Sequence, residues 1–299
     1  MLHLVTLLAA LAAVALVGAI AYKVVDGARL SISHFGLGFL TGTTWDAVRN
    51  VFGAGPLLFG TAVTSAIALL VATPLALAIG LYLSELAPGG VRGMIATLVE
   101  LLAAIPSVVL GLWGILVMAP FLAKHVEPWL HARLGFLGIF GAPSPTGLGV
   151  FTAGLILAIM VLPIVASISR ELFLAVPREL EDGALALGAT RWEMVRGVVL
   201  SSARPGIAAA VILGLGRALG EAIAVAQVSG DGFTIHGSLF DSGSTLASRI
   251  ALQFQGAVSK LQISSLFYLA VILLVIGLVT NLLAQLIVRR FEYQRVGAE

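Results

Sequence analysis

The chain has 299 residues, of which 59% are hydrophobic and only 11% are charged. Soluble domains are about half apolar and about one quarter charged, so this balance excludes an ordinary water-soluble protein and indicates a chain embedded in lipid. The formal net charge of +2 is too small to suggest a nucleic-acid partner, and the absence of cysteine excludes disulfides and thiolate metal sites. We therefore predict a single transmembrane domain that covers residues 1–299.

Six apolar runs are long enough to cross a membrane, for which a helix needs about 20 mostly apolar residues. They cover residues 2–25, 57–86, 93–123, 147–169, 206–229 and 264–288. The first run ends in a small-x-small pattern typical of a signal-peptide cleavage site, but it lacks an N-terminal Lys or Arg and is too long for a signal core. An uncleaved helix is therefore favoured. Prolines that can kink or break a helix lie within the second, third and fourth runs, at Pro74, Pro106 and Pro163.

Basic residues predict the orientation, because Lys and Arg are enriched in short cytoplasmic loops. The connection 170–204 holds five arginines, and the C-terminal tail holds three more. We expect both on the cytoplasmic side and, with six spans, the N-terminus as well. The loops 31–56, 124–145 and 230–260 would then lie outside. Three basic residues near the first external loop argue the other way, but the five-arginine loop outweighs them.

The connection 170–204 has the sequence signals of two short helices at a bend. Pro177 can start the first helix, with acidic residues in the first turns, where they complement the positive end of the helix dipole. Gly188 can end this helix, and Thr190 with Glu193 forms a capping-box pattern that would start the second. An ordinary connector needs none of these signals.

This helix-glycine-helix pattern resembles the EAA coupling loop of ABC importer permeases. The Glu-Ala-Ala of the motif falls on Asp182, Gly183 and Ala184, and its glycine falls on Gly188. The sequence departs from the motif where Asp replaces Glu, where Gly183 replaces Ala, and at Ser201, where many relatives have proline. The resemblance implies that this loop docks into a groove on an ATPase subunit. A cytoplasmic hairpin without a partner is the alternative.

Two charged residues, Arg217 and Glu221, lie inside the fifth apolar run. Their spacing places them on one face of a helix, where they can pair. Because a charge within a bilayer is costly unless it is paired or faces a wet cavity, such residues mark either a functional site or a structural ion pair. In the functional interpretation, Arg217 contacts an oxyanion, while Glu221 holds the guanidinium and limits how tightly the anion binds. Gly216 and Gly220 would let another helix approach closely.

The run Gly-Leu-Gly-Arg-Ala-Leu-Gly-Glu at 214–221 resembles that of PstC-type phosphate permeases, and similar stretches cover nearly the whole chain. The resemblance implies an all-α integral membrane fold, the six-helix bundle of a type I ABC importer permease, in the bacterial inner membrane. It also implies inorganic phosphate as the substrate, with Arg217 and Glu221 in the translocation pathway.

The same resemblance implies three kinds of protein partner and no cofactor. These are a second, PstA-like permease subunit, PstB-like ATPase subunits on the coupling loop, and a PstS-like extracytoplasmic phosphate-binding protein. In the last external loop, residues 238–240 and 245–248 are the candidate contact for that binding protein.

Other interpretations of the sequence remain open. The substrate of an ABC permease could be another oxyanion, such as sulfate, molybdate or phosphonate. An ion-coupled secondary transporter would show inverted repeats, which we do not detect, and a membrane scaffold would not depend on Arg217 and Glu221. The chain has no Gly-x-x-x-x-Gly-Lys-Ser/Thr, His-Glu-x-x-His or Gly-x-Ser-x-Gly, so we expect no enzyme activity, and any ATPase is a separate subunit.

Overall fold

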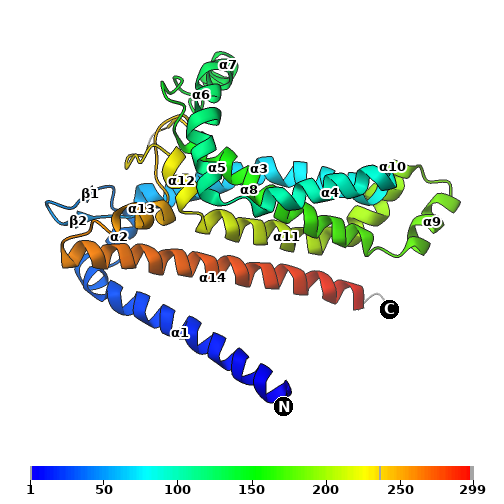
Figure 1. Ribbon diagram of the computed structural model, residues 1–299, viewed down its shortest axis with the longest axis horizontal. Coiled ribbons are helices and arrows are strands. Elements are labelled where there is room, and N and C mark those ends of the chain that lie inside the picture. The colour runs from blue at the N-terminus through cyan, green and yellow to red at the C-terminus, as the bar shows by residue number, and fades with distance from the viewer. Residues whose placement is uncertain (1, 236, 297–299) are drawn as a thin grey trace.

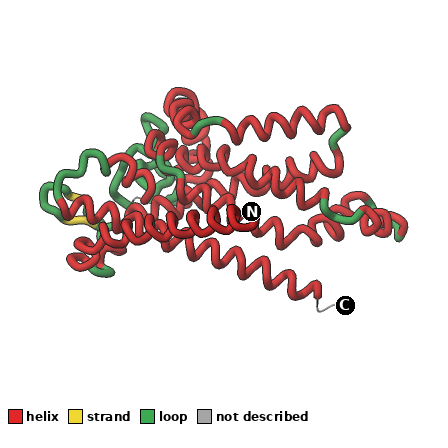
Figure 2. The backbone as a smooth tube through the Cα atoms, turned by 60° about the horizontal axis from the view of Figure 1, so that its bottom comes forward, coloured by secondary structure: helices red, strands yellow, loops and turns green. Residues whose placement is uncertain are grey.

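The computed structural model describes residues 2–235 and 237–296; Met1, His236 and 297–299 of the predicted domain lie outside the described residues. Most of the described chain is helical (Figures 1 and 2). The α-helices are α1 Leu2–Phe35, α2 Gly38–Thr41, α3 Gly55–Leu81, α4 Gly89–Ala104, α5 Ser107–Trp113, α6 Ala119–Phe121, α7 Glu127–Leu134, α8 Val150–Leu174, α9 Arg178–Ala186, α10 Arg191–Met194, α11 Leu200–Gly220, α12 Ile223–Val228, α13 Leu246–Gln253 and α14 Lys260–Val296. Shorter π-helical or 3-10 segments are η1 Tyr82–Leu86, η2 Gly114–Met118, η3 Leu122–Val126, η4 Gly135–Leu137 and η5 Val195–Val199. Strands β1 Trp45–Asp46 and β2 Val51–Phe52 form a small antiparallel ribbon.

Six helical stretches of the described chain are long and apolar enough to cross a membrane, as predicted. They are His3–Phe35, Gly55–Leu86, Ser107–Leu137, Val150–Leu174, Arg191–Gly220 and Lys260–Ile287. The first span is longer than predicted, because the helix continues through the polar residues that follow its apolar part.

The long helices α1, α3, α8, α11 and α14 run lengthwise through the molecule (Figure 1). The ribbon, α2 and α13 lie at one end, which we call the loop end. Helices α9 and α10 lie at the other, which we call the hairpin end. Figure 2 shows that most of the non-helical chain gathers at the loop end. Helix α1 contacts α14 near the loop end and diverges from it toward the N-terminus.

Helices α3 and α8 form the centre of the bundle, and small residues let them approach closely. Ala68, Ala72 and Ala76 of α3 are fully buried. A Cβ atom added to Gly154 of α8 would lie 2.7 Å from the Ile67 side chain of α3, which is too close for a real contact. Helix α11 packs against α8, α14 and α3, so its position is fixed by this centre.

The predicted third span, 93–123, is broken at Pro106, one of the prolines expected to kink or break a helix, and its bounds differ from the prediction. Ile105 and Pro106 have extended backbone and separate α4 from α5. Proline lacks the N–H that an α-helix needs and pushes the preceding residue out of the helical region. The helical stretch that starts at Ser107 then continues to Leu137, into the predicted external loop 124–145. Prolines inside α3 and α8, by contrast, leave those helices uninterrupted.

The predicted fifth span, 206–229, also differs from the structure. Helix α11 ends at Gly220, and Glu221 has extended backbone before α12 begins at Ile223. The Glu221 carboxylate Oε1 accepts a hydrogen bond from the Ala224 backbone N–H, at 3.2 Å. This bond satisfies a free donor at the start of α12 and so favours a break over continuation of the helix.

Candidate functional site

The two short helices at a bend that were predicted for the connection 170–204 are confirmed. Helix α9 starts directly after Pro177, and Gly188 follows its end with φ +89°. Thr190 and Glu193 form the predicted capping box at the start of α10: the Thr190 N–H donates to the Glu193 carboxylate at 2.7 Å, and the Glu193 N–H donates to the Thr190 hydroxyl at 3.3 Å. Local sequence signals therefore determine the shape of this hairpin.

The four residues matched to the coupling motif lie on the hairpin with different exposure. Asp182, Gly183 and Gly188 are exposed, whereas Ala184 is half-buried. Ala184 packs against an apolar cluster that includes Phe173 at the end of α8. The hairpin is thus attached to the bundle by its apolar side and presents the motif's polar and glycine positions to its surroundings.

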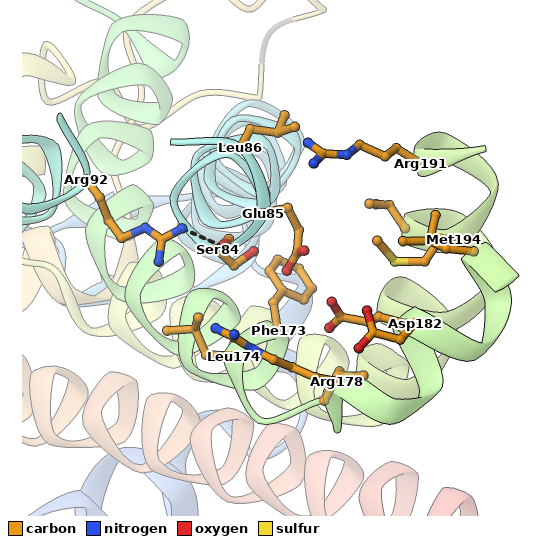
Figure 3. A pocket seen from close by; sticks show the side chains of 14 residues that line it. Ser84, Glu85, Leu86, Arg92, Phe173, Leu174, Arg178, Asp182, Arg191 and Met194 are labelled. Atoms are coloured by element: carbon orange, nitrogen blue, oxygen red, sulfur yellow. Dashed lines mark hydrogen bonds between the residues drawn. The ribbon is translucent and has the colours of Figure 1, made fainter. Parts of the chain in front are cut away.

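A polar cavity of about 350 Å³ lies between the hairpin and the turn from η1 to α4 (Figure 3). Its charged lining residues are Glu85, Arg92, Arg178, Glu181, Asp182 and Arg191. Figure 3 shows Glu85 of η1 and Asp182 of α9 pointing toward the same opening. One guanidinium N–H of Arg92 donates to the Ser84 carbonyl at 2.9 Å. The contribution of η1 and α4 to this site has no signal in the hairpin sequence, and we did not predict it.

The cavity is lined by equal numbers of acidic and basic side chains, which are not paired with one another. The ion pairs formed by described residues include none of its six charged residues. Burial, together with the nearby carboxylate of Glu85, raises the pKa of Glu181 above its ordinary value. The cavity therefore holds charged groups that a bound protein could neutralise.

The predicted pairing of Arg217 and Glu221 is confirmed, at 3.4 Å between Arg217 Nη2 and Glu221 Oε2. Its geometry is not that of two residues on one helix, because Glu221 lies just beyond the end of α11. The Glu221 side chain is 5% exposed and the Arg217 side chain is 46% exposed. The carboxylate is thus fixed in the bundle, and the guanidinium reaches outward from it.

Arg217 lines an open groove of about 520 Å³ between α8, α11 and α14. The groove is otherwise lined by Ile164, Ile212, Leu213, Gly216, Gly277, Thr280 and Asn281. A Cβ atom added to Gly216 or Gly220 would meet nothing within 4 Å, so this strip of α11 is open. A positive side chain in an otherwise mainly apolar groove is suited to bind an anion.

A buried arginine, Arg249, lies at the loop end. Arg249 of α13 pairs with Asp231 at 3.3 Å, donates to the Ser244 hydroxyl at 3.2 Å and lies over the Phe233 ring at 5.1 Å. Burial lowers the pKa of Arg249 from its ordinary value, and the Asp231 carboxylate opposes this effect. Asp231 has φ +50°, a conformation that Asp and Asn adopt more readily than other side chains. The cluster ties the loop after α12 to α13.

Replacing Asp231 with asparagine should destabilise the loop end without straining the backbone. The amide keeps the left-handed conformation but leaves the Arg249 charge without its carboxylate. Because Asp231 is itself half-exposed, we expect a loss of about 1–2 kcal/mol, below the range for a fully buried pair. Thermal unfolding of the detergent-solubilised protein should therefore show a melting temperature about 2–8 °C lower. An unchanged melting temperature would mean that solvent already balances the charge.

The predicted binding-protein contact at 238–240 and 245–248 is corrected in part by the structure, because most of these residues are buried. Phe240, Leu246 and Ser248 are each at most 1% exposed, and Thr245 is 4% exposed. Thr245 and Ser248 form a capping box at the start of α13. Phe240 and 245–248 therefore build the interior of the loop end, whereas Ser238 and Leu239 are half-buried and reach its surface.

Comparison with protein families decides the class of this chain. Residues 72–293 match the family described as binding-protein-dependent transport system inner membrane component. The chain belongs to this family. As an inner-membrane transport component with six candidate spans, it is a multi-pass membrane protein with a role in transport.

Relatives of this transport component extend over nearly its whole length. It is 42% identical to the phosphate transport system permease protein PstC of Mesorhizobium japonicum, over 99% of this chain and 91% of the relative. Identity to PstC of Haemophilus influenzae is 41%, over 96% and 92%. Identity to the probable phosphate transport system permease protein PstC of Methanocaldococcus jannaschii is 33%, over 88% and 84%.

Solved structures of ABC transporters share the fold of this transport component. A chain of a bacterial alginate ABC transporter aligns with a TM-score of 0.60 at 18% identity, covering 95% of this chain and 94% of that one. A chain of the MetNI methionine ABC transporter aligns with a TM-score of 0.52 at 20% identity, covering 80% and 95%. The predicted all-α fold of a type I ABC importer permease is therefore confirmed.

Proposed function

We propose that this chain is the permease subunit of an ABC importer that moves inorganic phosphate into the cytoplasm. The observation that carries the proposal is the position of Arg217. It lines the groove between α8, α11 and α14, and its guanidinium forms an ion pair with the buried Glu221 carboxylate. The similarity to phosphate permeases over nearly the whole chain supports phosphate as the substrate.

Arg217 and Glu221 have complementary roles in this proposal. The guanidinium attracts and orients the oxyanion, since it presents several N–H donors that match phosphate oxygens. The carboxylate orients the guanidinium and partly neutralises it. An anion held by a partly neutralised cation can leave again, which transport requires.

The α9–α10 hairpin is the proposed docking element for a PstB-like ATPase subunit, with Asp182, Gly183, Ala184 and Gly188 at the contact. Charged groups of the adjoining cavity can be neutralised by the bound ATPase. We place the hairpin end, with both termini, on the cytoplasmic side, because the loop 170–204 holds five arginines.

The remaining partners follow from the same proposal. A PstA-like permease subunit would complete the translocation pathway, and a PstS-like binding protein would deliver phosphate at the loop end. Residues 1–299 would act as one transmembrane domain surrounded by lipid, without a cofactor. The chain itself would catalyse no reaction, since ATP hydrolysis belongs to the separate ATPase subunit.

Reconstitution of the complex in liposomes tests this function. The chain is co-expressed with its partner subunits, and phosphate uptake is measured with the loaded binding protein outside and ATP inside. We expect uptake that requires ATP and is not reduced by excess sulfate or molybdate. ATP-dependent uptake of a different oxyanion would overturn the substrate, and uptake without the ATPase subunit would overturn the mechanism.

A further inference from the structure

Three polar side chains line the groove between α8, α11 and α14: Arg217, Thr280 and Asn281. Their hydrogen bonding differs. The Thr280 hydroxyl donates to the carbonyl groups of Ile276, at 2.6 Å, and Gly277, at 3.0 Å. Its polar group is therefore satisfied within α14, as is common for threonine in membrane helices.

Asn281 is different, because its side chain is exposed to the groove and has no hydrogen-bond partner among the described residues. It lies within the apolar span Lys260–Ile287, where Leu282 and Leu283 are also about half-exposed. An amide that stays unpaired in lipid costs several kcal/mol, so Asn281 requires a polar partner, and the described residues provide none. The groove is the place where that partner would lie.

Arg217 and Glu221 do not offer a bound anion in this groove a hydrogen-bond acceptor. A guanidinium can only donate. Glu221 can accept, but its side chain is 5% exposed and is not among the residues that line the groove. Phosphate near neutral pH carries both unprotonated oxygens, which accept, and a P–O–H group, which donates. Asn281 offers an amide N–H₂ to the first and a carbonyl oxygen to the second.

The groove also has room for such a ligand. Added Cβ atoms at Gly216 on α11 and Gly277 on α14 would meet nothing within 4 Å, so both helices leave open space at these positions of the groove that Arg217 and Asn281 line. We infer that Asn281 is a further substrate-contacting residue, which binds the protonated phosphate anion opposite Arg217. This inference rests on the proposed function and adds a neutral donor and acceptor to the charged pair.

Substitution of Asn281 tests the inference in the reconstituted complex. Asn281→Leu keeps the size but removes both hydrogen-bonding groups, and we expect phosphate uptake to fall at least about tenfold, the usual cost of a lost hydrogen bond to a charged group. ATP hydrolysis stimulated by the loaded binding protein should stay within about twofold, because the hairpin is unchanged. Asn281→Gln, which keeps the amide, should recover part of the uptake.

Thr280→Val is the matched control, since it alters the neighbouring groove residue whose hydroxyl is already satisfied. It should leave uptake within about twofold of wild type. The inference is overturned if Asn281→Leu retains wild-type uptake. It is also overturned if that variant lowers uptake, ATP hydrolysis and complex yield together. That result would mean that the Asn281 amide binds a helix of a second subunit and holds the complex together. A wild-type complex that carries no phosphate would instead overturn the proposed function, and the inference with it.

Discussion

Replacing Arg217 with glutamine is expected to lower ATP-driven phosphate uptake by at least about a hundredfold, the effect of losing a preorganised donor to an oxyanion. Glutamine keeps much of the length of the side chain but removes the positive charge that lines the groove. Because the Arg217 side chain is 46% exposed, the pathway role predicts that its loss leaves the packing of α11 and the yield of the complex unchanged. Radiolabelled phosphate uptake into proteoliposomes measures the first effect, and size-exclusion chromatography measures the second.

A double substitution separates the transport role from a structural ion pair. Arg217→Gln alone leaves the buried Glu221 charge without its partner, which would destabilise the bundle if the pair were structural. Adding Glu221→Gln removes that charge while its side-chain oxygen can still accept from Ala224. A structural pair predicts that the double variant regains uptake, whereas the pathway role predicts that it does not. Arg29→Gln, at an exposed position of α1, is the control for a lost arginine.

The sequence predicts the number of spans well, because apolar runs of membrane length leave few alternatives. The positions at which helices break are predicted less accurately. Pro106 ends a helix while Pro74 lies inside one, although both are prolines in apolar runs. Helix α3 packs against α8, with Ala72 and Ala76 on either side of Pro74 fully buried, and a proline in a sequence does not reveal such packing. At the end of α11 the break depends on a bond from Ala224 to Glu221, which a helical periodicity cannot reveal.

The candidate site was predictable where its signals are local. Gly188, Thr190 and Glu193 lie within six residues of one another and specify the bend between α9 and α10 directly. Asn281 could have been noticed as an amide inside an apolar span, by the rule that singled out Arg217. The sequence could not show that Asn281 lies in the same groove as Arg217, because α11 and α14 come together through packing between distant parts of the chain.

Gly188→Val is expected to uncouple the hairpin from the ATPase. Gly188 has φ +89°, which a β-branched residue adopts only with strain. We expect a cost of about 1–2 kcal/mol, which changes the population of the native bend by about 5–30-fold. Both phosphate uptake and the ATP hydrolysis stimulated by the loaded binding protein should fall about tenfold, because α9 and α10 no longer present one docking surface. The reconstituted complex provides both measurements.

Two control substitutions assign this effect to the backbone. A Cβ atom added to Gly188 would meet nothing within 4 Å, so a larger side chain has space within this chain and only its conformation is strained. Gly188→Asn should therefore retain most activity, since asparagine tolerates positive φ. Gly183→Ala lies within α9, also meets nothing within 4 Å, and should stabilise that helix by about 0.5–1 kcal/mol. If Gly188→Asn lost as much activity as Gly188→Val, the ATPase would instead have to approach Gly188 too closely for any side chain, and the bend itself would not be the cause.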